Sequence, residues 1–588
     1  MKSFLKYVLA SMVGFLLIGI VLFFIFVGTI ASIASFADEK PKKEKPNSVL
    51  YMDFQQPITD RKMDNPFANF DFSNPEGSLK NQPIQFFDFI RHIHKAKNDP
   101  NIKGIYIELK NLKIGLANLE EIRKALIDFK TSGKFIIIHA DVYSQLGYYL
   151  ATVADKIYLT PEGDVNFYGL NGQIMFYKGL LGKLNVEPEV IRHGKFKSAV
   201  EPFILDKMSE SNYLQTKTYV SSVWRNILDE ISKARHISVD SLNSLADAYA
   251  INGAENALKY HFVDGLKYHD EIIAELKDSL NIAPEDDLTQ ISMSDYVKLP
   301  LDIQITKDKI AIIYASGEIK MGQSDEKTIG SEGLAKQIQI ARQDSSIKAV
   351  VLRVNSPGGS ALASEIIWRE IILTKKVKPV IVSMGDVAAS GGYYISSPAD
   401  YILANKTTIT GSIGVFGLLW NAQKFFNDKL GITIDGYKTN EHADLGSLYR
   451  PMTATEKAIM QNMVEKTYHT FLSHVANGRG ISIADVDSIG QGRVWTGDDA
   501  KGIKLVDEYG GLEQALKVAA EKAGLKKYRI TELPKPAGFW ENLFDIETTK
   551  TKLLDSYSDN LYSQFKEMKS LTQRQGVMAL MPFTIKFE

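Results

Sequence analysis

Residues 385–394 read Gly-Asp-Val-Ala-Ala-Ser-Gly-Gly-Tyr-Tyr, and the rest of the chain is organised around this stretch. A buried-strand pattern, Pro-Val-Ile-Val-Ser-Met, precedes it at 379–384, and the apolar run at 393–397 predicts a helix. Ser390 therefore stands at a strand-to-helix turn between pairs of small residues, where a hydroxyl is exposed and helix N–H groups face a ligand. That arrangement suits a nucleophile. A small-residue turn that packs a helix tightly on a sheet explains the stretch equally well.

The composition of the chain excludes several classes of function. The 588 residues include no cysteine and carry a net charge of −1. The near-neutral charge does not favour binding to nucleic acid, and the missing cysteines exclude thiol nucleophiles, disulfides and cysteine-bound metals. We find no HExxH motif, no phosphate-binding Walker loop and no carboxylate cluster with metal-ligand spacing, so we expect no metal and no cofactor.

The N-terminus predicts a membrane anchor. Residues 7–33 are almost purely apolar and uncharged, which is long enough for a helix to span a bilayer. We expect a short cytoplasmic tail at 1–6 and a solvated linker at 34–47, with the body outside the cytoplasm. Lysines flank the apolar segment on both sides, so charge counts alone do not fix its orientation. Small residues at 31–35 leave cleavage of the segment open.

The body of the chain contains an internal repeat. Residues 147–157, Gly-Tyr-Tyr-Leu-Ala-Thr-Val-Ala-Asp-Lys-Ile, match 392–402, Gly-Tyr-Tyr-Ile-Ser-Ser-Pro-Ala-Asp-Tyr-Ile, at an offset of 245. Residues 102–109 match 347–354 at the same offset. Strands alternate with amphipathic helices in each copy, so the fold class is α/β. The expected domains are 48–300 and 301–536, followed by a C-terminal helical tail at 537–588.

The two copies differ at the residues that could carry chemistry. Gln145 occupies the place of Ser390, and Lys113 and Ile114 occupy the places of Gly358 and Gly359. A turn that needed a small residue for packing alone would show one in both copies. The comparison therefore favours a functional role for the serine.

Acyl transfer also needs an oxyanion hole and a base. The loop Asn-Ser-Pro-Gly-Gly-Ser at 355–360 follows a predicted strand, and its glycines can turn N–H groups toward a developing oxyanion. We expect Gly359, with Gly358, to share this task with Gly391. The second copy offers three histidines as bases, and a buried lysine with a lowered pKa is a further option; chemistry alone leaves the choice among them open. These histidines are His442, His469 and His474.

The motifs at 355–360, 385–394 and 410–415 together resemble the signal peptide peptidase A family, also called protease IV. The resemblance is to the long form, with an N-terminal anchor and two tandem domains similar to the Clp protease and crotonase fold. It implies a serine–lysine dyad with Ser390 as nucleophile. The general base falls on Lys197 in the segment Lys-Ser-Ala-Val-Glu-Pro-Phe, not on the nearby Lys195, and Ser412 orients the lysine.

The resemblance further implies how the protein works in the cell. Its substrates would be remnant signal peptides, at a bacterial cytoplasmic membrane with the catalytic body on the extracytoplasmic side. It implies a ring-like homotetramer in which lysine and serine come from neighbouring subunits, although the sequence itself does not separate that arrangement from contact within one chain. The alternatives are a crotonase-type acyl-CoA enzyme and a non-catalytic membrane scaffold.

The tail contains two further segments. Residues 540–570 are amphipathic and are expected to be helical, and 576–583 are apolar. The second segment is too short to span a bilayer. It could pack on a neighbouring subunit, lie at the membrane surface or dock on its own domain.

Overall fold

The computed structural model describes residues 6–7, 11–21, 45–61, 83–110, 112–301, 304–325, 327–534 and 576–581. Within these ranges, no helix combines the length and the apolar character that crossing a membrane requires. The predicted anchor at 7–33 falls only partly on described residues, and the predicted helix at 540–570 lies outside them.

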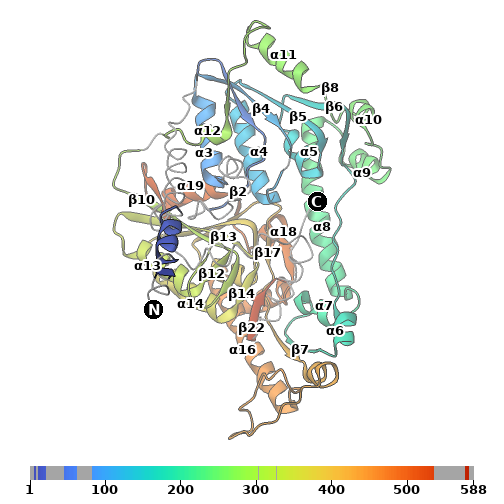
Figure 1. The fold of residues 1–588 in the computed structure, drawn as a ribbon, viewed down its shortest axis with the longest axis vertical. Coiled ribbons are helices and arrows are strands. Elements are labelled where there is room, and N and C mark those ends of the chain that lie inside the picture. Colours follow the sequence, from blue (N-terminus) through green and yellow to red (C-terminus); the bar gives the residue numbers. More distant parts are fainter. Residues whose placement is uncertain are drawn as a thin grey trace.

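The first half of the chain builds a sheet of six parallel strands in the order β8-β6-β5-β4-β1-β9. Its central strands β4 and β5 are rich in isoleucine and mostly buried, as expected for strands covered on both faces. Helices α3 (Phe86–Asn98) and α4 (Leu116–Lys130) pack against it in the upper part of Figure 1. The strands are β1 (Ser48–Met52), β4 (Ile102–Glu108), β5 (Phe135–Tyr143), β6 (Lys156–Val165), β8 (Gly265–Leu266) and β9 (Gln290–Ser292).

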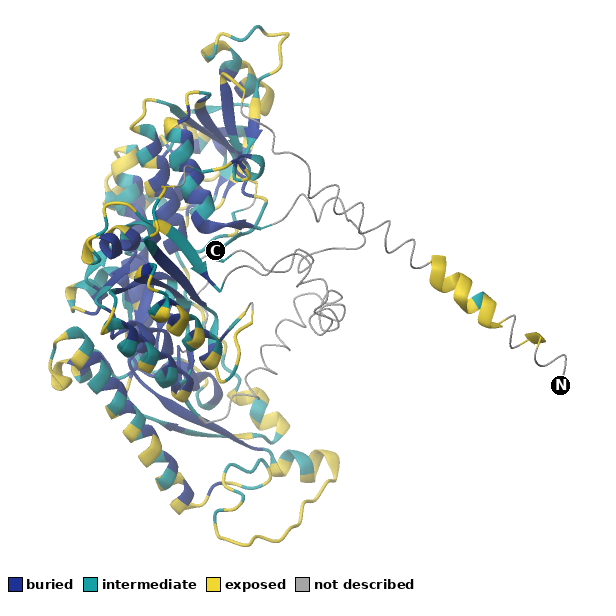
Figure 2. Cartoon of the chain, turned by 90° about the vertical axis from the view of Figure 1, so that its left-hand side faces the viewer, coloured by how far each residue is buried: buried dark blue, intermediate teal, exposed yellow. Residues whose placement is uncertain are grey.

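The second half repeats this plan. Its sheet has the order β19-β17-β15-β13-β10-β21, and β16 and β20 extend it from β15. The strands are β10 (Lys309–Ser316), β13 (Ile347–Ser356), β15 (Val380–Ala389), β16 (Tyr401–Ala404), β17 (Ile409–Gly411), β19 (Val494–Thr496), β20 (Glu508–Tyr509) and β21 (Arg529–Leu533). Figure 2 shows the buried strands of both halves running through an elongated, curved body.

The repeat seen in the sequence is present in the structure. Helices α13 (Ser331–Gln343) and α14 (Ala361–Lys375) begin and end 245 residues after α3 and α4. The long helix α8 (Glu210–Arg235) recurs as α16 (Ala454–Arg479), at an offset of 244. The α/β class and the two copies are confirmed, while the domain bounds 48–300 and 301–536 stay predictions.

A third sheet joins the halves. Its order is β12-β11-β14-β22-β18-β7, and β7 (Glu187–Arg192) pairs antiparallel along the whole of β18 (Phe416–Asn421). The first half therefore sends a segment onto the second half, and α8 returns from it along one side of the molecule (Figure 1). The remaining strands are β11 (Glu318–Lys320), β12 (Thr328–Gly330), β14 (Gly358–Ser360) and β22 (Gly576–Leu580).

Buried charges also hold the two halves together. Arg353, on β13, is fully buried and lies 2.9 Å from a carboxylate oxygen of Glu121 on α4. Its guanidinium also donates to Asn118 at 2.6 Å. Asp386 accepts from the backbone N–H of Ala117 at 2.9 Å, in the first turn of α4. These contacts fix α4 against the strand that leads to Ser390.

Candidate active site

Ser390 lies between β15 and the short helix α15 (Gly391–Ser396), at the predicted strand-to-helix turn. Its backbone has φ 56° and ψ −114°, a conformation that costs energy for any residue with a side chain and that clusters at functional sites. The Ser390 N–H donates to Gly411 O at 2.8 Å, and its own carbonyl accepts from Tyr394 N at 2.8 Å. The surrounding backbone therefore holds the turn in place.

Lys197 meets Ser390 from the first half of the chain. It follows β7 and precedes a turn of 3₁₀ helix at Ser198–Val200. Its Nζ lies 2.8 Å from Ser390 Oγ, and both side chains are fully buried. Burial lowers the pKa of the Lys197 ammonium well below its usual range, because a charged group loses its hydration there.

Ser412 completes the group around the lysine. It follows β17, has φ 50°, and donates its N–H to Arg493 O at 2.7 Å. The Lys197 Nζ lies 3.0 Å from Ser412 Oγ and 3.3 Å from Ser412 O. The structure thus brings together the three side chains that the resemblance selected. The hydroxyl groups of Ser390 and Ser412 both lie within hydrogen-bond distance of the Lys197 amine.

The loop that carries Lys197 is held by residues that sequence reasoning missed. Gln215, a fully buried residue of α8, donates to Phe196 O at 3.1 Å and to Ser198 Oγ at 2.7 Å. Its amide oxygen accepts from Val494 N in the second half at 3.3 Å. A glutamine on a helix gives no signal of such a role in one sequence, since its partners lie at distant positions.

Gly492 allows the closest approach to the lysine. It has φ 83°, and a Cβ at this position would lie 2.6 Å from Lys197 Cα. Glycine adopts such a conformation without steric cost and leaves room for a neighbouring backbone. The adjacent Gln491 O accepts from Phe196 N at 3.0 Å. The second half therefore contacts the backbone of the loop that carries Lys197.

The three expected oxyanion glycines do not have equivalent N–H groups. Gly358 donates its N–H to Ser356 Oγ at 3.2 Å. Gly359 pairs instead with Ala579 of β22, and Gly391 begins α15 directly after Ser390. The Gly358 N–H is thus engaged by a side chain and Gly359 is paired with a backbone strand, while Gly391 lies next to the serine at the start of a helix.

The apolar segment near the C-terminus docks on its own chain. β22 pairs antiparallel with β14 on one side and with β18 on the other. This decides among the alternatives that the sequence left open for the described residues of that segment, 576–581.

One implication of the resemblance is wrong. Lysine and serine were expected from neighbouring subunits, whereas the 2.8 Å contact joins Lys197 and Ser390 of a single chain. The physical reason is the pairing of β7 with β18, which carries the lysine across to the second half.

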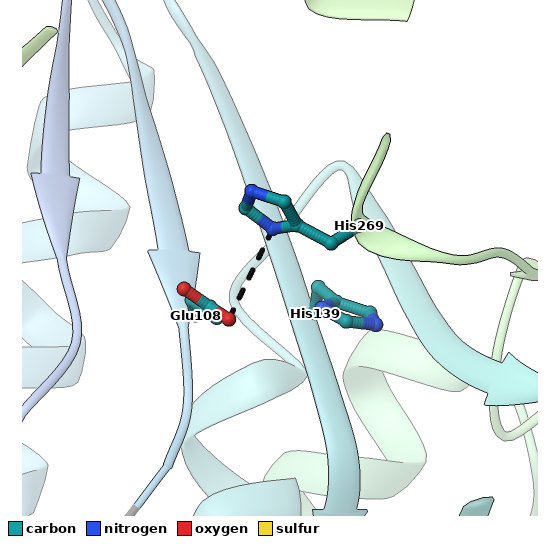
Figure 3. Close-up of side chains that lie close together, drawn as sticks. All are labelled: Glu108, His139 and His269. Atoms are coloured by element: carbon teal, nitrogen blue, oxygen red, sulfur yellow. Dashed lines mark ion pairs between the residues drawn. The ribbon is translucent and has the colours of Figure 1, made fainter. Parts of the chain in front are cut away.

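A second group of polar side chains lies on the first sheet. Glu108, His139 and His269 place one ligand atom each within 4.8 Å of one another, which the sequence analysis did not foresee (Figure 3). His269 Nδ1 and Glu108 Oε1 lie 3.9 Å apart, the ion pair dashed in Figure 3. Tyr51 also donates to Glu108 at 2.5 Å, and the Tyr106 hydroxyl lies 3.1 Å from His269 Nδ1. Zinc with ligands at about 2.1 Å needs donor atoms about 3.4 Å apart, so this group would have to close before it held such an ion.

The model of peptidase family S49 matches residues 128–283 and residues 372–526. The chain belongs to peptidase family S49. The first match contains Lys197, and the second contains Ser390 and Ser412. Each copy of the repeat thus supplies one part of the buried group.

Curated relatives agree with the family. Protease 4 of Salmonella typhi is 39% identical over 460 residues, covering 76% of this chain and 74% of that protein. Protease 4 of Haemophilus influenzae is 38% identical over 450 residues, 74% of this chain and 73% of that protein. The chloroplastic serine protease SPPA of Arabidopsis thaliana is 33% identical over 480 residues, 78% of this chain and 71% of that protein.

This chain is therefore a serine peptidase of family S49, and these findings favour the peptidase over the acyl-CoA enzyme and the scaffold. Among solved structures, a mutant of ClpP1 from Listeria monocytogenes is 17% identical and has a TM-score of 0.24, covering 35% of this chain and 94% of that one. The assignment of the two copies to the Clp and crotonase fold stays a prediction.

Proposed function

We propose that this peptidase cuts peptide bonds with a dyad of Ser390 as nucleophile and Lys197 as general base. The observation that carries the proposal is the 2.8 Å contact between Lys197 Nζ and Ser390 Oγ in a fully buried site. A lysine serves as a base only when its amine is neutral. Burial favours the neutral amine, because the charged ammonium loses its hydration. The lowered pKa of Lys197 supports this role.

The proposed reaction has two stages. Neutral Lys197 takes the hydroxyl proton as Ser390 Oγ attacks the carbonyl carbon, and it then gives the proton to the leaving amine. Water next hydrolyses the ester on Ser390, with the same amine as base. Ser412 holds the lysine through the 3.0 Å contact, while the Gly359 and Gly391 N–H groups stabilise the oxyanion.

The cellular setting is a further part of the proposal. An anchor at 7–33 would hold the body at a bacterial cytoplasmic membrane on the extracytoplasmic side, where remnant signal peptides are the substrates. The described part of this segment supports an anchor, because residues 11–21 are helical and their large apolar side chains are 42–82% exposed (Figure 2). Apolar surface of this kind is expected to be covered, by lipid or by protein. The homotetramer implied by the resemblance belongs to the same proposal.

The dyad is tested with three single variants and a quenched fluorescent peptide. Lys197→Ala and Ser390→Ala should abolish cleavage, whereas the exposed Lys195→Ala should leave it nearly unchanged. Full activity in Lys197→Ala would reject the assignment. Thioester turnover that survives in Ser390→Ala would favour the acyl-CoA alternative instead.

A mixing experiment tests whether one chain forms the site. Inactive Lys197→Ala and Ser390→Ala proteins are combined under conditions that exchange subunits. Contact within one chain predicts that the mixture stays inactive, because every chain lacks one partner. Recovery of activity would mean that neighbouring chains share the site.

A further inference from the structure

Three side chains that can act as metal ligands meet in the first half of the chain. Glu108 is the last residue of β4, His139 stands beside it on β5, and His269 begins helix α11 (His269–Ser279) (Figure 3). One ligand atom from each lies within 4.8 Å of the others. Two imidazoles and one carboxylate are a set of ligands that zinc takes in sites where water holds the fourth position.

Hydrogen bonds fix which nitrogen of His139 carries the proton of its neutral ring. The Thr160 hydroxyl donates to Asp141 at 2.5 Å, so its oxygen can only accept from His139. His139 Nε2 lies 3.1 Å from that oxygen and therefore carries the proton. The lone pair is left on Nδ1. Because Thr160 is on β6, which borders β5 on the side away from β4, Nδ1 is turned toward Glu108. Metal-binding histidines are oriented through their other nitrogen in the same way.

The Nδ1 atom of His139 is buried without a hydrogen-bond partner among the described residues. His139 is 3% exposed, and a buried polar atom that finds no partner costs free energy. Burial also lowers the pKa of the His139 imidazole, so the ring is neutral near pH 7, which is the form that binds metals. An ion on Nδ1 would satisfy an atom that the fold leaves without a contact.

The second half shows that the fold does not require these side chains. Glu108 pairs with His139 in the first sheet. At the corresponding place in the second sheet, 245 residues after Glu108, Arg353 pairs with Ser383. There the guanidinium donates to Ser383 Oγ at 2.8 Å and lies 2.9 Å from Glu121, so the chain itself supplies the positive charge. In the first half, a carboxylate and two imidazoles stand together instead, and all three are ligands for a cation.

Closing the group around an ion requires a small movement of His269. Its Nδ1 lies 3.9 Å from Glu108 Oε1, and zinc bound to both needs about 3.4 Å. The His269 side chain is 51% exposed and begins its helix, so it can turn with little repacking. The Tyr106 hydroxyl, 3.1 Å from the same nitrogen, is the contact that the ion would replace. Tyr51 and Lys110 approach the other oxygen of Glu108, Oε2, which leaves Oε1 for the ion.

We propose that Glu108 Oε1, His139 Nδ1 and His269 Nδ1 bind a divalent transition-metal ion, with Zn²⁺ the expected ion and water its fourth ligand. Imidazole and carboxylate donors suit zinc. The ion would join β4, β5 and the start of α11, at the upper end of the molecule in Figure 1. Since the site shares no residue with the dyad, its effect is on the stability of the first half and not on the chemistry at the serine.

The test is zinc binding by the full chain, purified in detergent and freed of metal with a chelator. Calorimetric titration with Zn²⁺ should show one site per chain, and bound zinc should raise the melting temperature. His269→Ala and Glu108→Gln should each weaken binding by more than about 100-fold, the upper range for loss of an outer partner of a ligand. The exposed His469→Ala should bind zinc as the wild type does. A wild-type chain that binds no zinc, or unchanged binding in His269→Ala, would overturn the proposal.

A further variant tests the orientation of His139. Thr160→Val has a similar volume but removes the acceptor for the Nε2 proton, so zinc affinity should fall by about 10- to 100-fold. Unchanged affinity in Thr160→Val would contradict the assignment of Nδ1 as the ligand. His269→Ala and Thr160→Val should both cleave an external peptide as the wild type does. Loss of cleavage together with zinc binding would refute a site that acts apart from the dyad.

Discussion

Gly492→Ala is predicted to slow the enzyme strongly, although it substitutes neither residue of the dyad. Gly492 has φ 83°, and a Cβ there would lie 2.6 Å from the backbone nitrogen, Cα and Cβ of Lys197. These atoms do not have the freedom of a flexible side-chain end. The new methyl group must therefore push the Lys197 loop away from the second half.

The magnitude follows from that distance. Carbon atoms in ordinary contact lie about 3.5 Å apart, so the loop must move by about 1 Å. A misplacement of about 1 Å costs about 100-fold in rate. A left-handed alanine adds a cost in stability of about 1 kcal/mol, which lowers the melting temperature by a few degrees.

Gly524→Ala is the matched control, because Gly524 has φ 66° and no atom within 4 Å of an added Cβ. It should lose similar stability and keep its activity. The assay compares kcat/KM on a fluorescent peptide with melting temperatures for both variants. If Gly492→Ala cleaves the peptide within about twofold of Gly524→Ala, the packing argument for the Lys197 loop is wrong.

Three further predictions concern the base, its partner and the contact between the halves. The rate kcat/KM should rise with pH through the lowered pKa of Lys197 and level off below the pH at which an ordinary lysine titrates, about 10.4; a rate that falls over this range would contradict a lysine base. Ser412→Ala removes a 3.0 Å contact with the amine, so kcat/KM should fall by about 5- to 10-fold, as expected for one hydrogen bond of about 1 kcal/mol, and an unchanged rate would exclude the positioning role. Arg353→Ala leaves the carboxylate of Glu121 buried without its partner, so the free energy of unfolding in urea should fall by about 3–5 kcal/mol, while the exposed Arg369→Ala should change it little.

The plan of the fold was largely predictable from one sequence. The offset of 245 between the copies predicted two domains of the same plan, because both halves have similar apolar strand patterns and helices of equal length. Helices α3 and α13 are an example. The role of Ser390 could also be predicted, since its turn is local in sequence and the first copy has Gln145 in its place. Local pattern and internal comparison are enough for features of this kind.

The partner of Ser390 could not be predicted in this way. Lys197 is 193 positions away, and its burial depends on a strand that crosses to the other half, so only the family resemblance selected it. Gln215 and Gly492 were missed because their roles exist only in the folded loop. The group of Glu108, His139 and His269 was missed for the same reason, since it forms between two strands of a parallel sheet and the first residue of helix α11 (His269–Ser279).

The C-terminal strand shows what a correct pattern leaves undecided. The apolar segment at 576–583 was recognised, but three docking places were open to it. Pairing with β14 depends on the glycines of a loop more than 200 positions earlier, and their close contact with Ile319 O and Ala579 O appears only in three dimensions. The length and hydropathy of the segment alone do not predict how its residues pair with those of β14.

Fluorophosphonate labelling of the full chain tests the Ser390–Lys197 dyad most directly. The probe should modify the wild-type protein at Ser390, located by peptide mass spectrometry, and labelling should disappear in Ser390→Ala. In Lys197→Ala it should slow by at least about 100-fold, the contribution of a general base, with no comparable change in Lys195→Ala. Labelling that persists in Ser390→Ala, or that proceeds at the wild-type rate in Lys197→Ala, would contradict the dyad.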